Sequence, residues 1–538
     1  MLNSHNGRLV AIITLLLFIG ILLTVRQTAP HKTAVANALP VAGPGDNDLS
    51  SPITTTRLVN YLPLLLHFEA GTTSFSDPPL LEFPPTNSTL ARTLFNWVDV
   101  SGAAGYWFQL ATDASFNNIV RNQFVPVSEL AFTSTLDGTH YWRVYATDTA
   151  PGNGAAGVTG DGPLSDVWLV NLVTYSADLD GDRLLNGWEL HGYDSNDDGI
   201  PEVDLPTLGA SYRHKDIFVE MDYMVRADAT FGIGPNQTVL NEIVASFAAA
   251  PVTNPDGVTG ITIHLEMGDV VPYDETLDPV STEFYALKDS YFDARKTAVY
   301  HYMIWANQYG TSSSSGLSFG IPASDFIVSL GTWNGGNGGT DPQKIGTFIH
   351  ELGHNLGLTH GGDDHTNYKP NYLSVMNYAF QTIGVYREGS PGHFDYQRFL
   401  LPSLDETNLN ETVGLNGPPA ADSYYTYYRC PNGNYSSWVR ANAPIDWNCD
   451  NDKIDIGLIA NINGDKNGET PIYSVLGSQD NWANIVFGGN GSIGSGQEPG
   501  LLAQWIRETA VVPDIVELTF EQNAELHKNL PAYPEHMP

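Results

Sequence analysis

The sequence predicts a multidomain protein in which a β-sandwich over residues 79–173 precedes an α/β domain over residues 209–500. The first part carries short runs of alternating apolar and polar residues with turn residues between them, which is typical of antiparallel strands. In the second part strand-like and helix-like runs alternate, which favours mixed α/β layers. A stretch rich in Asp, Asn and Gly, over residues 174–208, separates the two and predicts a segment of its own.

The balance of charged residues limits the partners of the chain. Its 538 residues are 42% hydrophobic, which allows about three or four domains with true cores. There are 24 basic residues against 60 acidic ones, and the net charge is −36. Such a charge repels nucleic acid, so we expect no nucleic-acid partner. The sequence leaves the oligomeric state open.

The N-terminal region predicts export. Residues 9–25 form a run of 17 uncharged, mostly apolar residues, and we expect residues 1–26 to be a signal peptide or a membrane anchor. Both alternatives place the body of the protein outside the cytoplasm, either secreted or held at the outer face of the membrane. Residues 27–78, rich in Pro, Thr, Ala and Gly, are predicted to be a linker.

The predicted β-sandwich rests on four strand-like runs, at residues 93–97, 106–111, 141–146 and 167–170. Their aromatic residues, among them Trp97 and Tyr141, are expected to fill its core. The pattern resembles a fibronectin type III domain, and the resemblance implies a spacer or docking role without chemistry.

The acidic segment begins with a run that matches the ligand spacing of an EF-hand calcium loop. The side chains at positions 1, 3, 5, 9 and 12 of this run are Asp178, Asp180, Asp182, Asn186 and Glu189. Arg183 stands where such loops usually have glycine, and Gly181 is the alternative place for the turn. We expect bound calcium here, and the alternative is an Asx-rich turn without an ion.

A second run in the same segment lacks a closing glutamate and carries the side chains Asp194, Asn196, Asp198 and Asp204. The two runs together resemble the calcium loops of thrombospondin type 3 repeats. The resemblance implies a calcium-stiffened joint between the β-sandwich and the domain that follows.

The alternation of elements in the second domain begins at residue 216. Strands are expected at residues 216–224, 261–266, 299–305 and 326–330, and helices at residues 239–250 and 283–296. Asp341 and Pro342 then predict the start of another helix, because Asp favours the N-cap and Pro the first turn. After residue 385 the chain is rich in Tyr, Asn, Gly and Pro, which predicts an irregular C-terminal subdomain.

This last helix carries the pattern H-E-x-x-H-x-x-G-x-x-H. His350 and His354 are four residues apart, so both imidazoles can reach one metal ion from a single helix face. Gly357 lets the chain leave the helix with positive φ, and that turn can return His360 as a third ligand. Three nitrogen ligands leave a fourth position open for water, and Glu351 is placed to accept a proton from it.

The pattern resembles the metzincin clan of zinc metallopeptidases. A second element typical of that clan lies at residues 374–378, where Met376 would pack beneath the three imidazoles. The resemblance implies a Zn²⁺-dependent endopeptidase acting on protein or peptide, with Glu351 as general base. It also implies that Tyr378 ligates the resting metal or hydrogen-bonds the oxyanion, while a packed core tyrosine is the alternative.

Other assignments stay open. The third ligand could instead be His365, Asp363 or Asp364, and a gluzincin arrangement would use Glu388. The alternative functions are a zinc hydrolase of a non-peptide amide and a catalytically inactive surface adhesion protein. The intact Glu351 argues against an inactive protein.

The two cysteines, Cys430 and Cys449, are expected to form a disulfide in an exported protein. Two free thiols are the alternative, and the absence of a C-x-x-C spacing disfavours zinc binding by the pair. Residues 501–538 are predicted to be a C-terminal tail, and no functional residue is expected after about residue 512.

Overall fold

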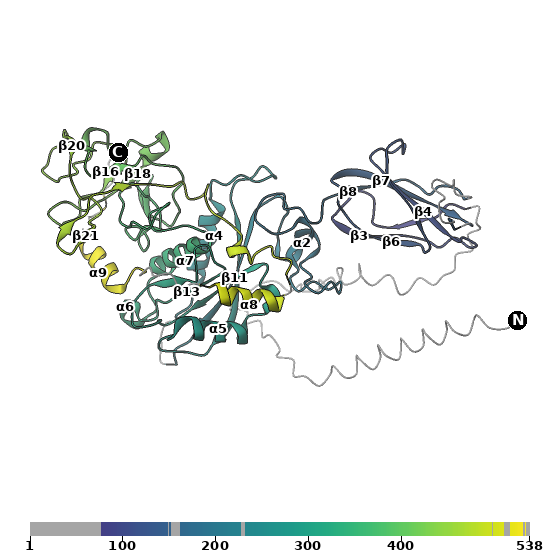
Figure 1. Cartoon of the computed structure of the whole chain (residues 1–538), viewed down its shortest axis with the longest axis horizontal. Coiled ribbons are helices and arrows are strands. Elements are labelled where there is room, and N and C mark those ends of the chain that lie inside the picture. Colours follow the sequence, from purple (N-terminus) through teal and green to yellow (C-terminus); the bar gives the residue numbers. More distant parts are fainter. Residues whose placement is uncertain are drawn as a thin grey trace, which may run out of the picture. The chain divides into compact units, whose positions relative to one another are not determined.

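The computed structural model describes residues 77–530, except residues 149, 152–161, 228–231, 498 and 511–516, together with residue 533. The predicted export segment and residues 27–76 of the predicted linker lie outside this part of the chain. Among the described residues, no helix is both long enough and apolar enough to cross a membrane. The architecture is mixed α/β with several sheets, which confirms the predicted fold class at that level (Figure 1).

Two sheets form within residues 81–172. One has the order β1 (Leu81–Phe83), β3 (Arg92–Trp97) and β6 (Glu129–Thr133). The other has the order β2 (Ser88–Leu90), β8 (Trp168–Leu172), β7 (Gly138–Thr147), β4 (Gly105–Ala111) and β5 (Ile119–Val125). Buried aromatic residues of both sheets share one core that includes Phe95, Trp97, Phe108 and Trp142. The likeness to a fibronectin type III domain stays a prediction.

A second five-stranded sheet, the central sheet, lies further along the chain, within residues 216–328. Its order is β10 (Thr262–Val271), β9 (Asp216–Met224), β11 (Tyr300–Trp305), β13 (Asp325–Val328) and β12 (Gly316–Ser318). The first four strands are parallel, and β12 runs antiparallel at the edge. The sequence did not predict β12, because three residues are too few to show an alternating pattern.

Helices cover both faces of this sheet: α4 (Gln237–Ala248), α5 (Val280–Tyr291) and α7 (Asp341–Asn355). Because β10 and β11 flank β9 on opposite sides, right-handed crossovers place α4 and α5 on opposite faces. Helix α7 contacts α4, β12 and β13, and Figure 1 shows α7 and α5 on opposite sides of β13. The edge strand and α7 therefore lie next to each other.

Short elements make up the rest of the chain. The helical turns are α2 (Asn186–His191), α3 (Leu205–Leu208), η3 (Ala294–Lys296), α6 (Trp333–Gly336), η4 (Glu411–Val413), η5 (Pro419–Ser423) and η6 (Gly489–Gly491). One small sheet joins β15 (Ser390–His393), β14 (Val385–Arg387), β18 (Tyr424–Thr426) and β19 (Val439–Arg440). The remaining strand pairs are β16 (Leu404–Asp405) with β23 (Val475–Leu476), β17 (Leu409–Asn410) with β20 (Ile456–Leu458), and β21 (Lys466–Asn467) with β22 (Thr470–Pro471).

A disulfide and an aromatic core hold this C-terminal region together. Cys430 and Cys449 are bonded, with their Cα atoms 5.8 Å apart. The buried core nearby includes Phe380, Tyr427, Trp438 and Trp447. The region is irregular in secondary structure, yet its side chains are packed.

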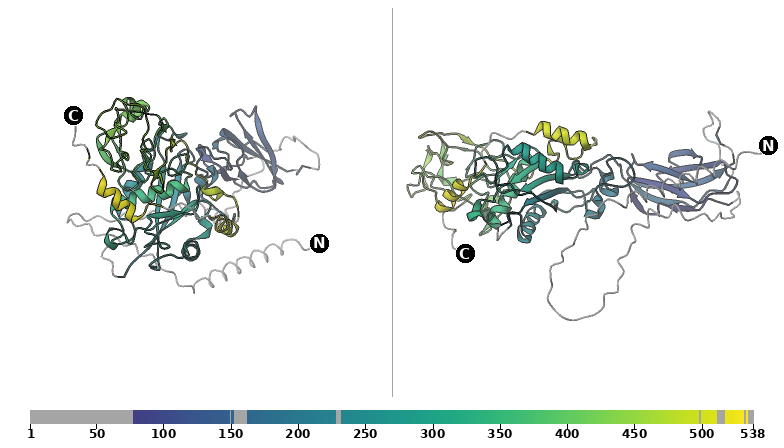
Figure 2. Two further views of the ribbon diagram at one scale, coloured as in Figure 1. Left: turned by 60° about the vertical axis from the view of Figure 1, so that its left-hand side comes forward. Right: turned by 90° about the horizontal axis from the view of Figure 1, so that it is seen from below.

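The described residues of the predicted C-terminal tail are also packed against the rest of the chain. They form α8 (Pro499–Thr509) and α9 (Phe520–Asn529), which Figure 2 shows in yellow on separate parts of the molecule. Leu502, Ile506 and Leu518 belong to the main hydrophobic core, which is the core around the five-stranded sheet and α7. Leu526 belongs to the core around the disulfide. Four apolar side chains at irregular spacing give no clear helical period, which is why the sequence pattern did not reveal this packing.

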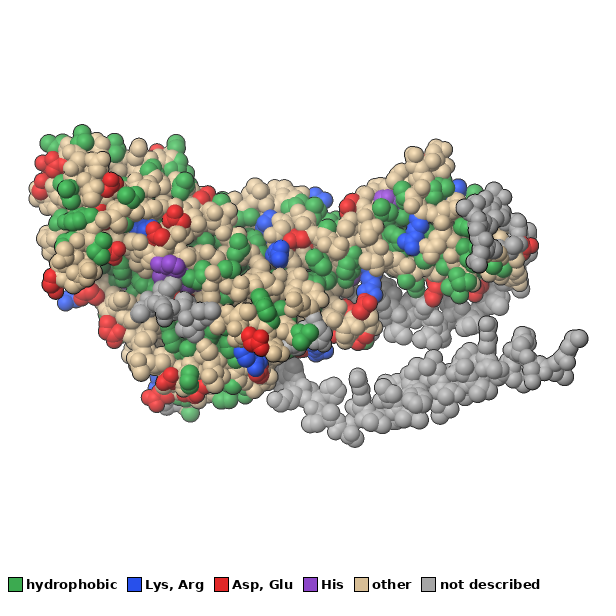
Figure 3. Space-filling view, viewed as in Figure 1, with side chains coloured by type: hydrophobic (Ala, Val, Ile, Leu, Met, Phe, Trp, Pro, Cys, Tyr) green, Lys and Arg blue, Asp and Glu red, His purple; other side chains and the backbone are tan. Residues whose placement is uncertain are grey.

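The surface agrees with the acidic composition. On the face drawn in Figure 3, Lys and Arg side chains are few and scattered among acidic and neutral ones.

Candidate metal centre

Helix α7 has well-defined ends that fix its histidines. Thr340 is the N-cap, and its side chain and that of Gln343 form a capping box around the first turn. The N-cap therefore lies one residue before Asp341, which the sequence favoured for this role and which is the first helical residue. At the other end Gly357 has φ +88°, and Leu358 N donates to Gly353 O across 2.9 Å. This C-terminal turn ends the helix and directs the chain back towards its own side chains.

Three histidine side chains converge beside α7. The Nε2 atoms of His350, His354 and His360 lie 3.1–3.2 Å from one another, and all three side chains are buried. His350 Nδ1 donates to Val375 O at 2.8 Å, and His354 Nδ1 donates to Leu358 O at 2.7 Å. Because those carbonyls only accept, the Nε2 lone pairs of both rings face the shared centre.

The histidines are suited to bind a cation as neutral ligands. Burial lowers the pKa of His350 and that of His360, the latter to about 4. Neutral imidazoles are the form that binds metal ions.

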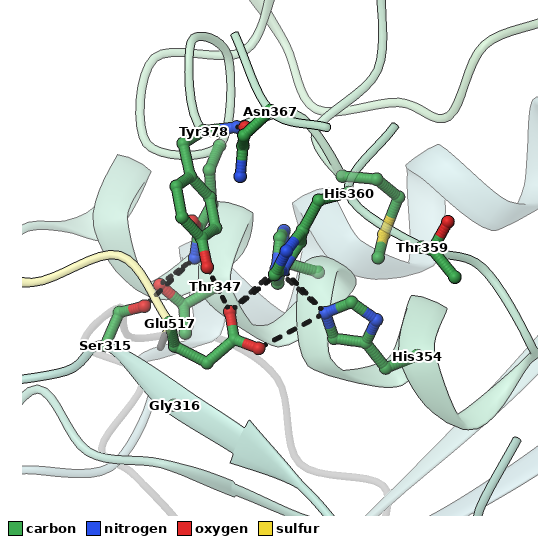
Figure 4. Close-up of polar contacts among 12 residues, drawn as sticks. Ser315, Gly316, Thr347, His354, Thr359, His360, Asn367, Tyr378 and Glu517 are labelled. Atoms are coloured by element: carbon green, nitrogen blue, oxygen red, sulfur yellow. Dashed lines mark hydrogen bonds and ion pairs between the residues drawn. The ribbon is translucent and has the colours of Figure 1, made fainter. Parts of the chain in front are cut away.

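A fourth side chain, which sequence reasoning missed, completes the cluster. Glu517 Oε2 lies 3.2 Å from Nε2 of both His350 and His360, and Oε1 lies 3.5 Å from Nε2 of His354. Figure 4 shows this carboxylate, which comes from the C-terminal part of the chain, facing His354, His360 and Tyr378. The only local signal in the sequence is a single acidic residue inside the otherwise apolar run 515–518.

The four side chains fit a metal ion. Together His350, His354, His360 and Glu517 form a buried group whose ligand atoms all lie within 4.8 Å of one another. Five of the six distances among the three Nε2 atoms and Glu517 are 3.1–3.2 Å, and the sixth, from Glu517 Oε1 to His354 Nε2, is 3.5 Å. A tetrahedron with edges of about 3.2 Å has its centre about 2 Å from each corner, close to usual zinc–nitrogen and zinc–oxygen distances. The nitrogen and oxygen donors thus have both the chemistry and the spacing of a tetrahedral site.

Glu351 lies next to this cluster and is not part of it. The residue is fully buried, and neither carboxylate oxygen has a hydrogen-bond partner among the described residues. Burial, together with the charge of Glu517, raises the pKa of Glu351 well above its ordinary value. A buried carboxyl group without a protein partner and with raised basicity is suited to proton transfer.

The wall behind the histidines comes from residues 374–381. A Cβ atom at Gly353 would lie 2.4 Å from Met376 Sδ, so the methionine sulfur packs against the turn of α7 that joins the two helical histidines. A Cβ atom at Gly346 would overlap with the carbonyl of Gln381. These two glycines allow α7 to approach the chain that carries Met376 and Tyr378.

Tyr378 reaches the cluster through its hydroxyl group. Its phenol donates a hydrogen bond to Glu517 Oε2 across 3.0 Å, and its ring centre lies 4.5 Å from that of His360. Burial, followed by the charge of Glu517, raises the pKa of Tyr378 well above its ordinary value. The phenol therefore keeps its proton and acts as a donor.

Residues 308–377 match the family Peptidase M66. The matched stretch begins before β12 and ends at Asn377, so it contains the three histidines and Glu351. The match supports a metallopeptidase, and the buried three-histidine and glutamate group supports a bound metal. No curated protein sequence matches the chain.

The other candidates for the third ligand lie elsewhere. His365 and Glu388 are exposed and are not part of the cluster. Asp364 accepts a hydrogen bond from Lys369 Nζ at 2.6 Å, and Asp363 is exposed beside Gly477. Of the histidines and acids weighed from the sequence, His360 is the one that the structure brings to the other two histidines.

The first acidic loop forms a second buried group. Asp182 belongs to two groups of three carboxylates, and in each group one oxygen per residue lies within 4.8 Å of the others. Its partners are Asp178 and Asp180 in one group, and Glu189 and Asp216 in the other. Asp216, the first residue of β9, was not predicted because it lies 27 residues after Glu189 in the chain, outside the loop pattern.

The electrostatics of this group favour a bound cation. Glu189 is buried, and neither of its carboxylate oxygens has a partner among the described residues. Burial and the neighbouring acids raise the pKa of Asp180 to about 6 and that of Glu189 to about 11. A divalent cation would neutralise these repelling carboxylates, and hard oxygen donors are the ligands that calcium prefers.

Two predicted ligands of the loops have other contacts. The Asn186 amide oxygen accepts from Leu179 N at 3.0 Å, and the Asp204 carboxylate accepts from Thr207 N at 3.2 Å as the N-cap of α3. Arg183 itself adopts the positive φ of +79° that the loop requires, as does Gly181.

In the second loop, Gly199 N donates to Asp194 Oδ2 at 2.8 Å, and Asp198 N donates to Asn196 Oδ1 at 2.9 Å. Among the described residues, no close group of three potential metal-binding side chains includes Asp194, Asp198 or Asp204. Both loops thus have the hydrogen bonds of Asx turns, and the first loop also has a buried acidic cluster.

Proposed function

We propose that the protein is a zinc-dependent endopeptidase of the metzincin type, with Glu351 as its general base. One observation carries this proposal: three buried histidine Nε2 atoms converge within 3.1–3.2 Å beside a buried glutamate that has no hydrogen-bond partner among the described residues. The match to Peptidase M66 over residues 308–377 supports a metallopeptidase.

Zn²⁺ would be held by His350, His354 and His360, and it would supply Lewis-acid activation of water and of the scissile carbonyl. Glu351 would accept the proton of the attacking water on a carboxylate oxygen and deliver it to the leaving amine. Its burial favours the first of these steps, because a raised pKa makes the carboxylate a stronger base.

Tyr378 would stabilise the negative oxygen that develops during attack. In the structure its phenol already donates to an anionic oxygen beside the histidines, Oε2 of Glu517. The same donor would serve a reaction oxyanion in that place, with the phenol proton retained because of the raised pKa.

The edge of the central sheet next to α7 supports a protein or peptide substrate. Strand β12 is the edge strand and contacts α7. An extended peptide can add to such an edge through backbone hydrogen bonds. That placement would bring a peptide bond next to the metal-binding helix.

We also propose that the first acidic cluster binds Ca²⁺ through Asp178, Asp180, Asp182, Glu189 and Asp216. The ion would connect the acidic loop to the first residue of β9. Removal of the ion should then destabilise the attachment of the loop to the central sheet.

Finally, we propose that the protein acts outside the cytoplasm, as a secreted or surface-anchored enzyme. The apolar run at residues 9–25 supports export. The Cys430–Cys449 disulfide supports an oxidising environment.

The test is hydrolysis of a peptide library by the purified, zinc-loaded protein and by its Glu351→Gln variant, with zinc content measured for both. We expect cleavage by the wild type, loss of cleavage in the variant at unchanged zinc content, and loss of wild-type cleavage with a chelator. If neither the zinc-loaded wild type nor a Glu517→Ala variant cleaves any peptide, the endopeptidase proposal is contradicted.

A further inference from the structure

The chain around Glu517 pairs with the edge of the central sheet. Ser314 and Thr519 form an antiparallel bridge, and Ser315 N donates to Leu518 O across 2.9 Å. Phe520 N donates to Ser313 O across 3.1 Å. Residues 517–520 therefore run antiparallel to the chain that leads directly into β12.

The register places the glutamate at the metal centre. Continuing the pairing from Ser314 and Thr519 by two residues sets Glu517 opposite Gly316, the first residue of β12. Figure 4 shows Glu517 beside Gly316, with its carboxylate turned towards the histidines. The backbone pairing and the carboxylate contact are thus parts of one binding mode.

Side chains on both sides of Glu517 anchor the segment. Leu518 is fully buried in the main core, and the Phe520 ring centre lies 5.6 Å from that of Trp333. In α9, Asn523 accepts a hydrogen bond from Thr382 Oγ1 at 2.6 Å. The segment is held by backbone, apolar and polar contacts together.

Glu517 would occupy the fourth position around a metal ion held by the three histidines, which is the position that catalysis requires for water. The other three positions are histidine nitrogens, and a hydrolytic zinc site keeps its fourth position open. The carboxylate is buried, with contacts to the three imidazoles and to the Tyr378 phenol. With Glu517 in this position, a peptide carbonyl and a water molecule would have no place beside a metal ion bound to the three histidines.

We propose that residues 517–520 are a built-in inhibitory segment, which occupies the position of a peptide substrate on the sheet edge and closes the metal site with Glu517. The inference rests on the proposed function, because it concerns regulation of that same site. Catalysis then requires the segment to leave, after which the fourth position and the edge of the sheet become available to a peptide.

The test uses the full-length protein with Co²⁺ in place of zinc. The visible absorption of Co²⁺ reports its coordination, and acetohydroxamate probes the fourth position without any need for turnover. Wild type is compared with Glu517→Ala and Glu517→Gln, and Glu525→Gln on the exposed side of α9 is the matched control. Thermal unfolding checks that each variant is folded.

We expect both Glu517 variants to change the Co²⁺ spectrum and to bind acetohydroxamate more tightly, with Glu525→Gln equal to wild type. A segment bound about 90% of the time would weaken the apparent affinity of the probe about tenfold, so a gain of that size or more is expected. Peptide hydrolysis by the zinc forms should rise by a similar factor.

The outcomes separate the two proposals. Equal spectra and equal acetohydroxamate affinity in wild type and Glu517→Ala would overturn the inhibitory segment, whatever the activity. Loss of the metal from the variants without tighter probe binding would also overturn it, because Glu517 would then be a permanent ligand. Tighter probe binding without cleavage of any peptide would support the inhibitory segment and contradict the endopeptidase.

Discussion

The carboxylate of Glu351 packs against the backbone of Gly316. A Cβ atom at position 316 would lie 2.5 Å from Glu351 Oε1 and 2.6 Å from its Cγ. Strand β12 thus reaches the proposed general base only because this position has no side chain.

Gly316→Ala should therefore displace Glu351 and lower kcat/KM by about 100-fold, the effect expected for a misplaced catalytic group. Steady-state peptide hydrolysis measures the change, and zinc content should stay at the wild-type level. The control is Gly496→Ala, where an added Cβ meets no atom within 4 Å. Wild-type activity in folded Gly316→Ala protein would show that the contact does not position Glu351.

Tyr378→Phe should lower kcat by about 100-fold or more, because it removes a donor aimed at the reaction oxyanion. The phenol donates to an anionic oxygen at 3.0 Å in the structure, which gives the expected direction of the hydrogen bond. Zinc content and KM should change little.

The matched control for Tyr378 is Tyr425→Phe, whose hydroxyl group accepts from Arg440 away from the metal centre. A loss of zinc in Tyr378→Phe, with the remaining zinc-loaded fraction fully active, would instead make the tyrosine a supporting residue of the site.

Calcium should stabilise the protein through the acidic loop. Calcium at about 100 times its Kd contributes about 2.7 kcal/mol to stability, which corresponds to a rise in Tm of several degrees. Glu189→Gln should reduce this rise, because it removes a buried carboxylate from the cluster.

Thermal unfolding with calcium or with a calcium chelator measures that effect, and Glu242→Gln on the exposed side of α4 is the control. An identical calcium response in Glu189→Gln and Glu242→Gln would place the ion elsewhere.

His301 should make the protein less stable at acidic pH. It is fully buried in β11, and burial lowers its pKa from 6.5 to about 4. The unfolded chain binds a proton below pH 6.5 while the folded protein does not. The contribution of His301 to the free energy of unfolding is therefore fully present above pH 6.5. It is lost as the pH drops from 6.5 to 4, by about 3 kcal/mol for a pKa shift of this size.

Chemical unfolding at pH 7 and at pH 4.5 tests this prediction. His301→Gln should lose less stability than wild type between the two values, since the other buried histidines titrate in both proteins. Equal losses would mean that His301 is not responsible for the acid sensitivity.

Local spacing explains which parts of the metal centre could be predicted. His350, Glu351 and His354 lie within one helical turn or so, and His360 follows a turn that Gly357 permits, so the sequence pattern alone places them together. Tyr378 and Met376 belong to a second short pattern close by in the chain. Glu517 lies 157 residues after His360, and no spacing rule connects them.

The same reasoning applies to the acidic loop and the fold. The ligand spacing of Asp178, Asp180, Asp182 and Glu189 is local, whereas Asp216 joins them only because β9 begins beside the loop. The long strands and helices had visible periods. Strand β12 and the α8–α9 region depend on tertiary packing, which short or irregular apolar patterns do not reveal.

Because Glu517 and the three histidines belong to one chain, dilution of the protein does not weaken their contact. Tethered groups commonly meet at effective concentrations in the millimolar range. A peptide substrate must therefore compete with a neighbour that is always present. A substrate with many cleavable segments on one molecule would also present them at a high effective concentration, whereas a single short peptide would not.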